Sequence, residues 1–274
     1  MKSILITGVS SGIGAATAAR FLKVGWRVIG TVRKPQDGVD LETLGGQNFS
    51  KLTLDIIDEA GVANLTVALP RLLGGAPLDV LCNNAGTSIP AATAEQSVAS
   101  FRAAVELNLI APFAVTRACL PLLLRPGGRI IFIGSLAGIH ALPFAAAYSA
   151  AKHGVEALAS SLRVELADTG IKTIVVAPGS VRTAIGEKIG RDAPIEGADG
   201  EFGPMFRRMG KYMLRQAESA LPPGAIAALI EKAASVQSPR ARYVATPGWL
   251  RNWLAPRLLS PEGRDRLWLR RLSE

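Results

Sequence analysis

Short apolar segments recur along the chain, and a stretch of helical length follows each of them. The segments that we interpret as strands cover residues 4–7, 27–31, 51–55, 80–83, 129–134 and 173–177. Two longer stretches, 97–124 and 148–168, have helical patterning, and Gly170 provides a stop for the second. Alternation of strand and helix is typical of βαβ units. The pattern therefore predicts an α/β fold, with a Rossmann-type doubly wound parallel β-sheet covered by helices on both faces.

Beyond residue 183 the alternation stops. Residues 184–223 are rich in Gly, Pro, Met and charged residues, and this segment is too long for an ordinary connection in a compact domain. We interpret it as a substrate loop that passes over a ligand site. A helix near 225–235 and a short strand near 243–246 follow. We therefore expect one domain over residues 1–247 and a separate tail over residues 248–274.

Composition agrees with a single globular domain and argues against several partners. The chain has 274 residues and is 49% hydrophobic, enough to bury a full core. Its formal net charge is +9, but residues 240–274 alone hold eight Arg against three acids. No nucleic-acid-binding motif accompanies the basic residues, so we expect no nucleic-acid partner. Cys82 and Cys119 lie in apolar segments, and His140 and His153 are isolated, so no metal site is predicted.

The first residues predict where the protein works. The chain opens on the strand pattern 3–7 rather than on a basic leader, and no uninterrupted apolar run approaches the length of a membrane span. We therefore expect a cytoplasmic protein.

A glycine-rich turn joins the first predicted strand to a helix. The segment reads Thr7-Gly8-Val9-Ser10-Ser11-Gly12-Ile13-Gly14. In that position, backbone N–H groups and the positive end of the helix dipole meet a pyrophosphate. The candidate cofactor-binding residues are Gly8, Ser10, Ser11, Gly12, Ile13 and Gly14. The alternative is a glycine turn that only permits tight packing.

The end of the second predicted strand distinguishes the two nicotinamide dinucleotides. An acid there would bind a ribose 2′-hydroxyl, whereas a basic residue would accept a 2′-phosphate. Arg33 and Lys34 follow Val32, with no acid between them, and the Arg33 guanidinium can form a charge-assisted fork on a phosphate. The sequence therefore favours NADP(H), with NAD(H) less expected. A solvated loop is the alternative for both side chains.

Tyr148 and Lys152 are four residues apart at the start of a predicted helix, so they share one face. A nearby ammonium and an oxidised nicotinamide would both favour the Tyr148 phenolate, which makes this residue a candidate acid and base. Ser135 ends the fifth predicted strand and could hold a substrate oxygen, or else cap a turn. Asn108 lies in an apolar helical stretch, where either a structural hydrogen bond or a proton relay accounts for it.

Over residues 4–183 these motifs resemble the short-chain dehydrogenase/reductase superfamily, in its compact single-domain branch. The resemblance implies that Asn108, Ser135, Tyr148 and Lys152 form the catalytic tetrad. In that tetrad Lys152 also binds the nicotinamide ribose and Asn108 holds a relay water. The further cofactor contacts that it implies are Asp55 at the adenine, Asn84, Ala85 and Gly86 at the cofactor floor, and Pro178, Gly179, Val181 and Thr183 at the nicotinamide.

The function expected from this resemblance is reversible hydride transfer between NADP(H) and a carbonyl compound or secondary alcohol. The 31–34 strand end and the long loop look like those of steroid and retinoid dehydrogenases, so we expect a lipophilic small-molecule substrate. The alternatives are an epimerase or dehydratase, and an NADP(H)-binding sensor or scaffold without turnover. The family usually assembles through the two long helices, which implies a homodimer or homotetramer.

The tail combines apolar and basic residues. Trp249, Leu250, Trp253 and Leu254 would share one side of a short helix that Pro256 interrupts, with Arg residues around them. Weak peripheral contact with a membrane surface is one interpretation. Packing of the tail on the domain or on another subunit is the other.

Overall fold

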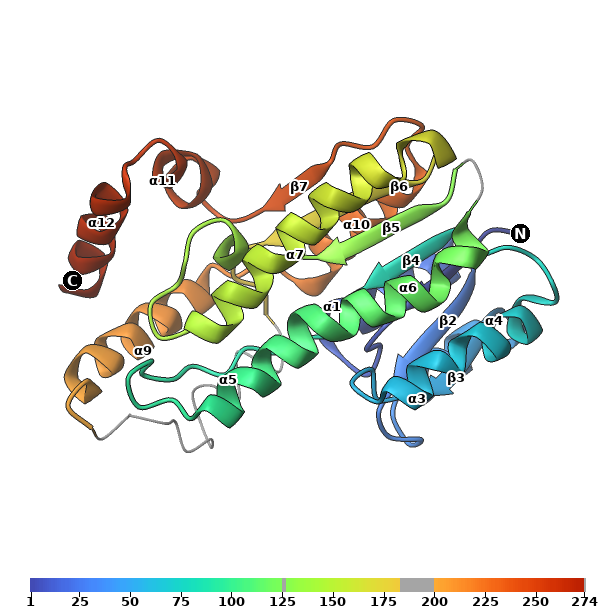
Figure 1. Ribbon diagram of the computed structural model, residues 1–274, viewed down its shortest axis with the longest axis horizontal. Helices are drawn as coiled ribbons and strands as arrows, with labels where there is room; N and C mark the ends of the chain where they lie inside the picture. The colour runs from blue at the N-terminus through green and yellow to red at the C-terminus, as the bar shows by residue number, and fades with distance from the viewer. Residues whose placement is uncertain (125–126, 183–199, 274) are drawn as a thin grey trace.

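A computed structural model describes residues 1–124, 127–182 and 200–273. Seven strands form one parallel sheet in the order β3-β2-β1-β4-β5-β6-β7 (Figure 1). Their bounds are β1 Ser3–Ile6, β2 Arg27–Val32, β3 Phe49–Thr53, β4 Val80–Asn83, β5 Arg129–Ile133, β6 Lys172–Pro178 and β7 Arg242–Ala245. The predicted Rossmann-type doubly wound sheet is confirmed.

Helices cover both faces of the sheet. They are α1 Gly12–Lys23, α2 Val39–Gly45, α3 Glu59–Ala63, α4 Leu65–Leu73, α5 Val98–Val105, α6 Ala111–Leu123, α7 Ala146–Glu165, α9 Gly203–Glu218, α10 Pro223–Ser235, α11 Ala255–Arg257 and α12 Pro261–Ser273. Side chains alternate along each strand, so β1 sends Leu5 into one core and Ile4 and Ile6 into the other. Residues of α4, α6 and α7 fill the first core, and residues of α1 and α10 fill the second.

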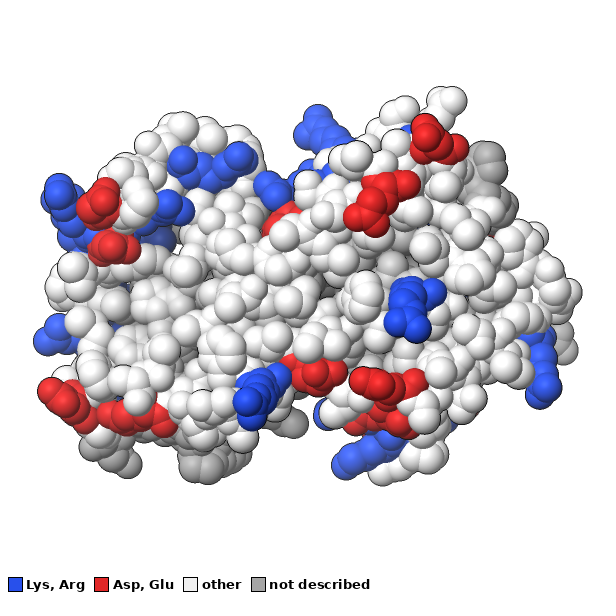
Figure 2. Space-filling model, in the orientation of Figure 1, with Lys and Arg blue, Asp and Glu red and all other residues white. Residues whose placement is uncertain are grey.

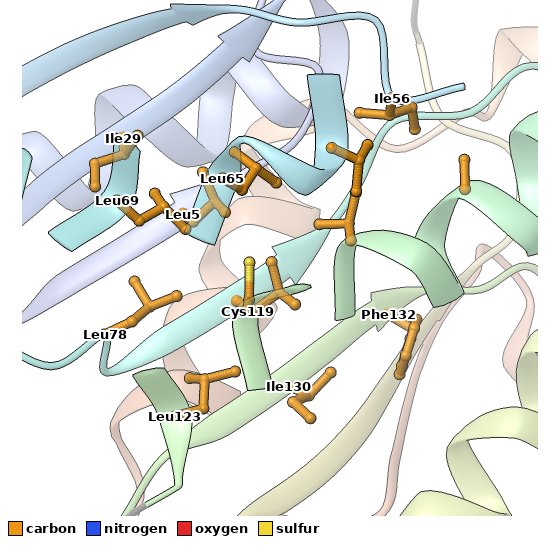
Figure 3. Packing of buried hydrophobic residues seen from close by; sticks show 14 of the residues in the cluster. Leu5, Ile29, Ile56, Leu65, Leu69, Leu78, Cys119, Leu123, Ile130 and Phe132 are labelled. Atoms are coloured by element: carbon orange, nitrogen blue, oxygen red, sulfur yellow. The ribbon is translucent and has the colours of Figure 1, made fainter. Parts of the chain in front are cut away.

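The first of these cores contains one of the two cysteines. Figure 3 shows Cys119 among Leu5, Leu65 and Ile130. Cys82 lies in the second core, and burial raises the pKa of each thiol to about 12. Both cysteines are therefore core residues, as predicted, and neither thiol is poised for reaction.

The long helix predicted over 97–124 is interrupted by one π-helical turn. The turn η2, Glu106–Ile110, separates α5 from α6 and contains Asn108. By length and composition, Val98–Leu123 meets the requirements of a membrane-crossing helix, although Arg102, Glu106 and Arg117 interrupt its apolar residues. One such helix is weak evidence for a membrane span, because the core helix of a soluble protein passes the same test.

The end of the chain is more helical than predicted. Helix α9 occupies much of the segment expected as a substrate loop, of which residues 184–199 lie outside the described part. In the tail, the π-helical turn η5, Leu250–Leu254, continues directly into α11. Pro256 therefore lies inside this helical segment, which ends one residue later at Arg257.

Candidate active site

The candidate residues gather at the carboxyl ends of the central strands. The glycine turn follows β1, Asn84 follows β4, Ser135 follows β5 and Gly179 follows β6. All strands are parallel, so these ends lie along one edge of the sheet, where ligands bind in open α/β folds. Helix α7 brings Tyr148 and Lys152 to the same edge beside Ser135.

The glycine turn has the backbone that its sequence requires. Gly8 and Gly12 have φ of +72° and +59°, in the left-handed region where side chains are disfavoured. A Cβ on Gly14 would lie 2.0 Å from the Gly8 carbonyl oxygen and 2.5 Å from Asn84 Nδ2, so only glycine fits there. Ser11 begins α1 without a side-chain cap, and the first turn contains no acid. The helix start therefore suits an anionic ligand.

Asn84 fixes the floor of this turn. Its Nδ2 donates to the carbonyl oxygens of Thr7 and Gly8, at 2.9 Å each. The Thr7 hydroxyl accepts in turn from the backbone amides of Asn84 and Ala85, at 2.9 and 3.0 Å. The predicted floor residues and the glycine turn are thus one hydrogen-bonded unit.

Arg33 and Asp55 lie at the outer part of the same edge, away from Tyr148. Arg33 follows the last residue of β2 and is exposed, as is Asp55 just beyond β3. The Asp55 carboxylate accepts from the Ile57 amide at 3.3 Å. Asp37 is the first acid after β2, so no carboxylate stands at the strand end itself.

The Ser135 hydroxyl lies beside Tyr148. Burial raises the pKa of Tyr148, and the polar contact with Ser135 acts in the opposite direction. Ser135 Oγ also accepts from the Ala137 amide at 3.1 Å, which caps the turn η3, Leu136–Gly138. The turn cap that we considered for Ser135 is therefore present, and its position beside Tyr148 is compatible with the predicted role of holding a substrate oxygen.

Lys152 lies under the tyrosine ring. Its side chain is only 5% exposed, and its Nζ is 5.6 Å from the ring centroid of Tyr148 and donates to the Ile133 carbonyl oxygen at 2.8 Å. Burial lowers the pKa of Lys152 to about 8. We expected the ammonium to lower the pKa of Tyr148, but burial is the larger influence on that tyrosine.

Asn108 is fully buried and hydrogen-bonded. Its Nδ2 donates to the carbonyl oxygens of Thr87 and Ala104 at 2.9 Å, and its Oδ1 accepts from the Thr87 amide at 3.2 Å. A Cβ on Gly86 would lie 2.7 Å from Asn108 Oδ1 and 3.6 Å from Lys152 Nζ. The structural hydrogen bond that we considered is present, and both Asn108 Oδ1 and Lys152 Nζ lie near the position that a Cβ on Gly86 would occupy.

The segment after β6 closes the far side of the site. The Gly179 amide donates to the Ala245 carbonyl oxygen at 2.8 Å, and Pro178 is the last residue of β6. Val181 forms a parallel bridge with Leu221, which ties this segment to the start of α10. Thr183 lies outside the described residues.

An apolar cavity is lined by residues that are close in sequence to Tyr148, and sequence reasoning missed its walls. It measures about 70 Å³ and includes Ala145, three residues before Tyr148, and Ser88, next to Thr87. Its apolar wall comes from the loop before α7 and from α9: Leu142, Phe144, Phe206, Met209 and Met213. The apolar spacing of 206, 209 and 213 was the signal that could have revealed it. No cluster of three potential metal ligands occurs in the described part of the chain.

Fold and site together define a dinucleotide-binding oxidoreductase, and comparison with known proteins gives the family. A family model described as short chain dehydrogenase matches residues 2–194. A protein named NADPH-dependent 3-dehydrocapnine reductase, from Ornithobacterium rhinotracheale, is 31% identical over 280 residues, covering 100% of this chain and 98% of that protein. The chain belongs to the short-chain dehydrogenase family.

Solved structures agree with this membership. A short-chain dehydrogenase from Streptomyces avermitilis superposes with a TM-score of 0.77 at 29% identity, covering 92% of this chain and 90% of that one. A variant of actinorhodin polyketide ketoreductase with NADPH superposes with a TM-score of 0.73 at 30% identity, covering 92% and 98% of the two chains.

Proposed function

We propose that this protein is an NADP(H)-dependent dehydrogenase/reductase that interconverts a ketone or aldehyde and the corresponding alcohol. One observation carries the proposal: the Tyr148 ring lies over the buried Lys152 ammonium and beside Ser135, and an apolar cavity begins at Ala145, three residues before Tyr148. A proton donor, an oxygen-binding hydroxyl and a cation thus meet at one point.

The chain's own residues would hold the cofactor and move the proton. The glycine turn and Asn84 fit the pyrophosphate, Arg33 a 2′-phosphate, and Lys152 the ribose next to the nicotinamide. When bound, the nicotinamide gives a hydride to the carbonyl carbon or takes one from the alcohol carbon. In reduction, Tyr148 Oη donates its proton to the carbonyl oxygen while Ser135 Oγ holds that oxygen. Burial keeps Tyr148 protonated at neutral pH, the state from which it acts as an acid.

Three features support NADP(H) over NAD(H). Arg33 is exposed where a 2′-phosphate would bind, and no carboxylate stands at the end of β2 to bind a free 2′-hydroxyl. The relative from Ornithobacterium is named for NADPH, and the actinorhodin ketoreductase is described with NADPH.

The cavity walls support a lipophilic substrate. Apart from Ser88, the residues that line the cavity are apolar or glycine. Ligand sites commonly reach about 300–1,000 Å³, so a cavity of about 70 Å³ would hold only part of a substrate next to Tyr148. Methionines from α9 suit this role, because their flexible side chains adapt to different apolar groups.

We further propose a cytoplasmic homodimer or homotetramer. Buried thiols without a disulfide suit a reducing compartment. The exposed apolar residues on α6 and α7 support self-association.

The test is NADPH oxidation, with NADH alongside, against lipophilic ketones, aldehydes and quinones. Wild type should turn over with NADPH preferred, and Tyr148→Phe should lower kcat by about 100-fold or more while still binding NADPH, since only the proton donor is removed. Tight NADPH binding without turnover of any compound would favour a sensor. Unchanged kcat in Tyr148→Phe would rule out the mechanism.

A further inference from the structure

Helix α9 and the C-terminal helix α12 lie together at one end of the molecule (Figure 1). Tyr212 of α9 packs edge-to-face on Trp268 of α12, with ring centroids 5.4 Å apart, and Met209 and Leu272 join the same cluster. The tail is also held to the active-site loop, where a ring nitrogen of His140 lies 3.3 Å from the Trp253 carbonyl oxygen. The tail is therefore part of the folded domain, and its outer side can act as a fixed surface.

This end concentrates the positive charge of the protein. Residues 200–218 and 249–273 contain ten Lys and Arg against four Asp and Glu, which is +6 of the formal net charge of +9. Figure 2 shows Lys and Arg side chains over α11 and α12 with a few Asp and Glu among them, whereas the face over α6 and α7 has few charged side chains. We call this surface the basic end. Besides Arg207, its exposed cations are Arg208, Lys211, Arg215, Arg251, Arg257, Arg266 and Arg270.

The charge of the basic end is not neutralised within the molecule. None of these seven cations forms an ion pair with any residue in the described part of the chain. Arg271, which is buried, donates to the Arg251 carbonyl oxygen at 3.1 Å, and its Nε has no partner there. The excess positive potential is thus directed outward, toward an anionic partner.

Large apolar side chains are exposed among these cations. Leu214 on α9 is 63% exposed, Leu250 is 67%, Leu258 is 78% and Leu269 on α12 is 57%. A solvated basic surface would not need them. Leucines interspersed with arginines are the composition of segments that lie in a membrane interface, with apolar groups in the acyl boundary and cations at lipid phosphates.

The aromatic residues favour lipid over nucleic acid. Trp249 and Trp253 pack on each other with centroids 4.7 Å apart, and the Arg257 guanidinium lies 5.0 Å from the Trp253 ring. Because Trp253 is contacted by both Trp249 and Arg257, its ring is poorly placed to stack on a base. Tryptophan is, however, a typical residue of the membrane–water boundary.

We propose that the basic end docks on an anionic lipid surface. Docking follows from charge and apolar exposure alone and does not depend on the proposed reaction. If that reaction is correct, docking has a consequence for the substrate: the inner face of α9 contributes Met209 and Met213 to the cavity, while its outer face contributes Lys211 and Leu214 to the basic end. A lipophilic substrate would then have a short path from the bilayer to Tyr148.

The experiment measures binding of the full-length protein to vesicles by co-sedimentation. Vesicles of phosphatidylcholine alone are compared with vesicles that also contain phosphatidylglycerol, at low and high salt. We expect binding to be about tenfold tighter with the anionic lipid and to weaken as salt is raised. Two double variants separate the contributions: Arg266→Gln with Arg270→Gln removes charge, and Leu250→Ser with Leu258→Ser removes apolar contact. Each should lower binding by about fivefold or more.

A matched control replaces an exposed cation and an exposed apolar residue outside the basic end. It combines Lys23→Gln on α1 with Val67→Ser on α4, where the Val67 side chain is 53% exposed. It should bind like wild type. All the replaced side chains are exposed, so circular dichroism and thermal unfolding should show intact folds. Equal binding to the two kinds of vesicle, or no loss in either tail variant, would overturn the proposal. So would tighter binding to duplex DNA than to vesicles, or dissociation of a native oligomer by the leucine variant, because each identifies a different partner.

Discussion

Lys152 is a cation placed where burial works against its charge. Burial lowers its pKa from the ordinary 10.5 to about 8, and its ammonium donates to the Ile133 carbonyl oxygen. Between these two pH values the unfolded chain binds more protons at this residue than the folded chain does. Folding stability therefore rises as pH increases through this window, and the penalty is fully present below about pH 8.

Comparison with Lys152→Met isolates this effect. From about pH 7 to about pH 10, wild type should gain about 2 kcal/mol of unfolding free energy relative to the variant, measured by urea denaturation. The control Lys232→Met, on the exposed side of α10, should show no such dependence. If the difference in unfolding free energy between wild type and Lys152→Met stays constant with pH, the pKa of Lys152 is not lowered in the folded protein.

Arg33 tests cofactor choice at a single residue. In Arg33→Ala, the KM for NADPH should rise about 10- to 100-fold, because a hydrogen bond between charged groups is lost, while the KM for NADH should change little. Steady-state kinetics with both cofactors measures the ratio. Lys172→Ala is the matched control, since it removes an exposed cation at the amino end of β6, the opposite edge of the sheet. Equal weakening for both cofactors would exclude Arg33 as the 2′-phosphate ligand.

At the scale of elements, the apolar pattern predicted the sheet, the helix of Tyr148 and the glycine turn. Each has a strong local signal: continuous apolar runs for buried parallel strands, and glycines where φ is positive or no Cβ fits. The π-helical turn at Asn108 could not be predicted, because its apolar neighbours suit an α-helix equally well. Helix α9 was missed because Gly, Pro and charged residues obscure the period that Phe206, Met209, Tyr212 and Met213 carry.

Gly210 links the stability of α9 to the shape of the cavity. A Cβ there meets nothing within 4 Å, yet the residue lines the cavity. Gly210→Ala should therefore raise the unfolding free energy by about 0.5–1 kcal/mol through helix propensity. The same methyl group should lower kcat/KM for bulky apolar substrates more than for small ones.

The matched control for this pair of effects is Gly224→Ala, in the first turn of α10. A Cβ there also meets nothing within 4 Å, but Gly224 does not line the cavity. It should not alter substrate preference. If Gly210→Ala leaves the preference unchanged as well, the cavity is not where the substrate binds.

For the whole molecule, the main question is what covers the apolar surface of α5, α6 and α7. Phe101, Ile110 and Phe113 are 36%, 44% and 46% exposed, and Val164 on α7 is 78% exposed. Only 22% of the 18-residue apolar stretch within Val98–Leu123 is buried. The surface over α6 and α7 is also largely uncharged (Figure 2), unlike the basic end. An uncharged apolar face on a chain of this family is the composition expected of an interface between subunits.

The last prediction distinguishes this face from the basic end. Light scattering of wild type should give the mass of a dimer or tetramer, and Phe113→Asp with Val164→Asp should give a smaller species that keeps its helical circular dichroism, because charge is introduced at exposed positions. The leucine double variant of the basic end, Leu250→Ser with Leu258→Ser, should keep the wild-type mass. A monomeric wild type would contradict self-association. The exposed helix face would then need another partner. It would become a second candidate surface for membrane binding, beside the basic end.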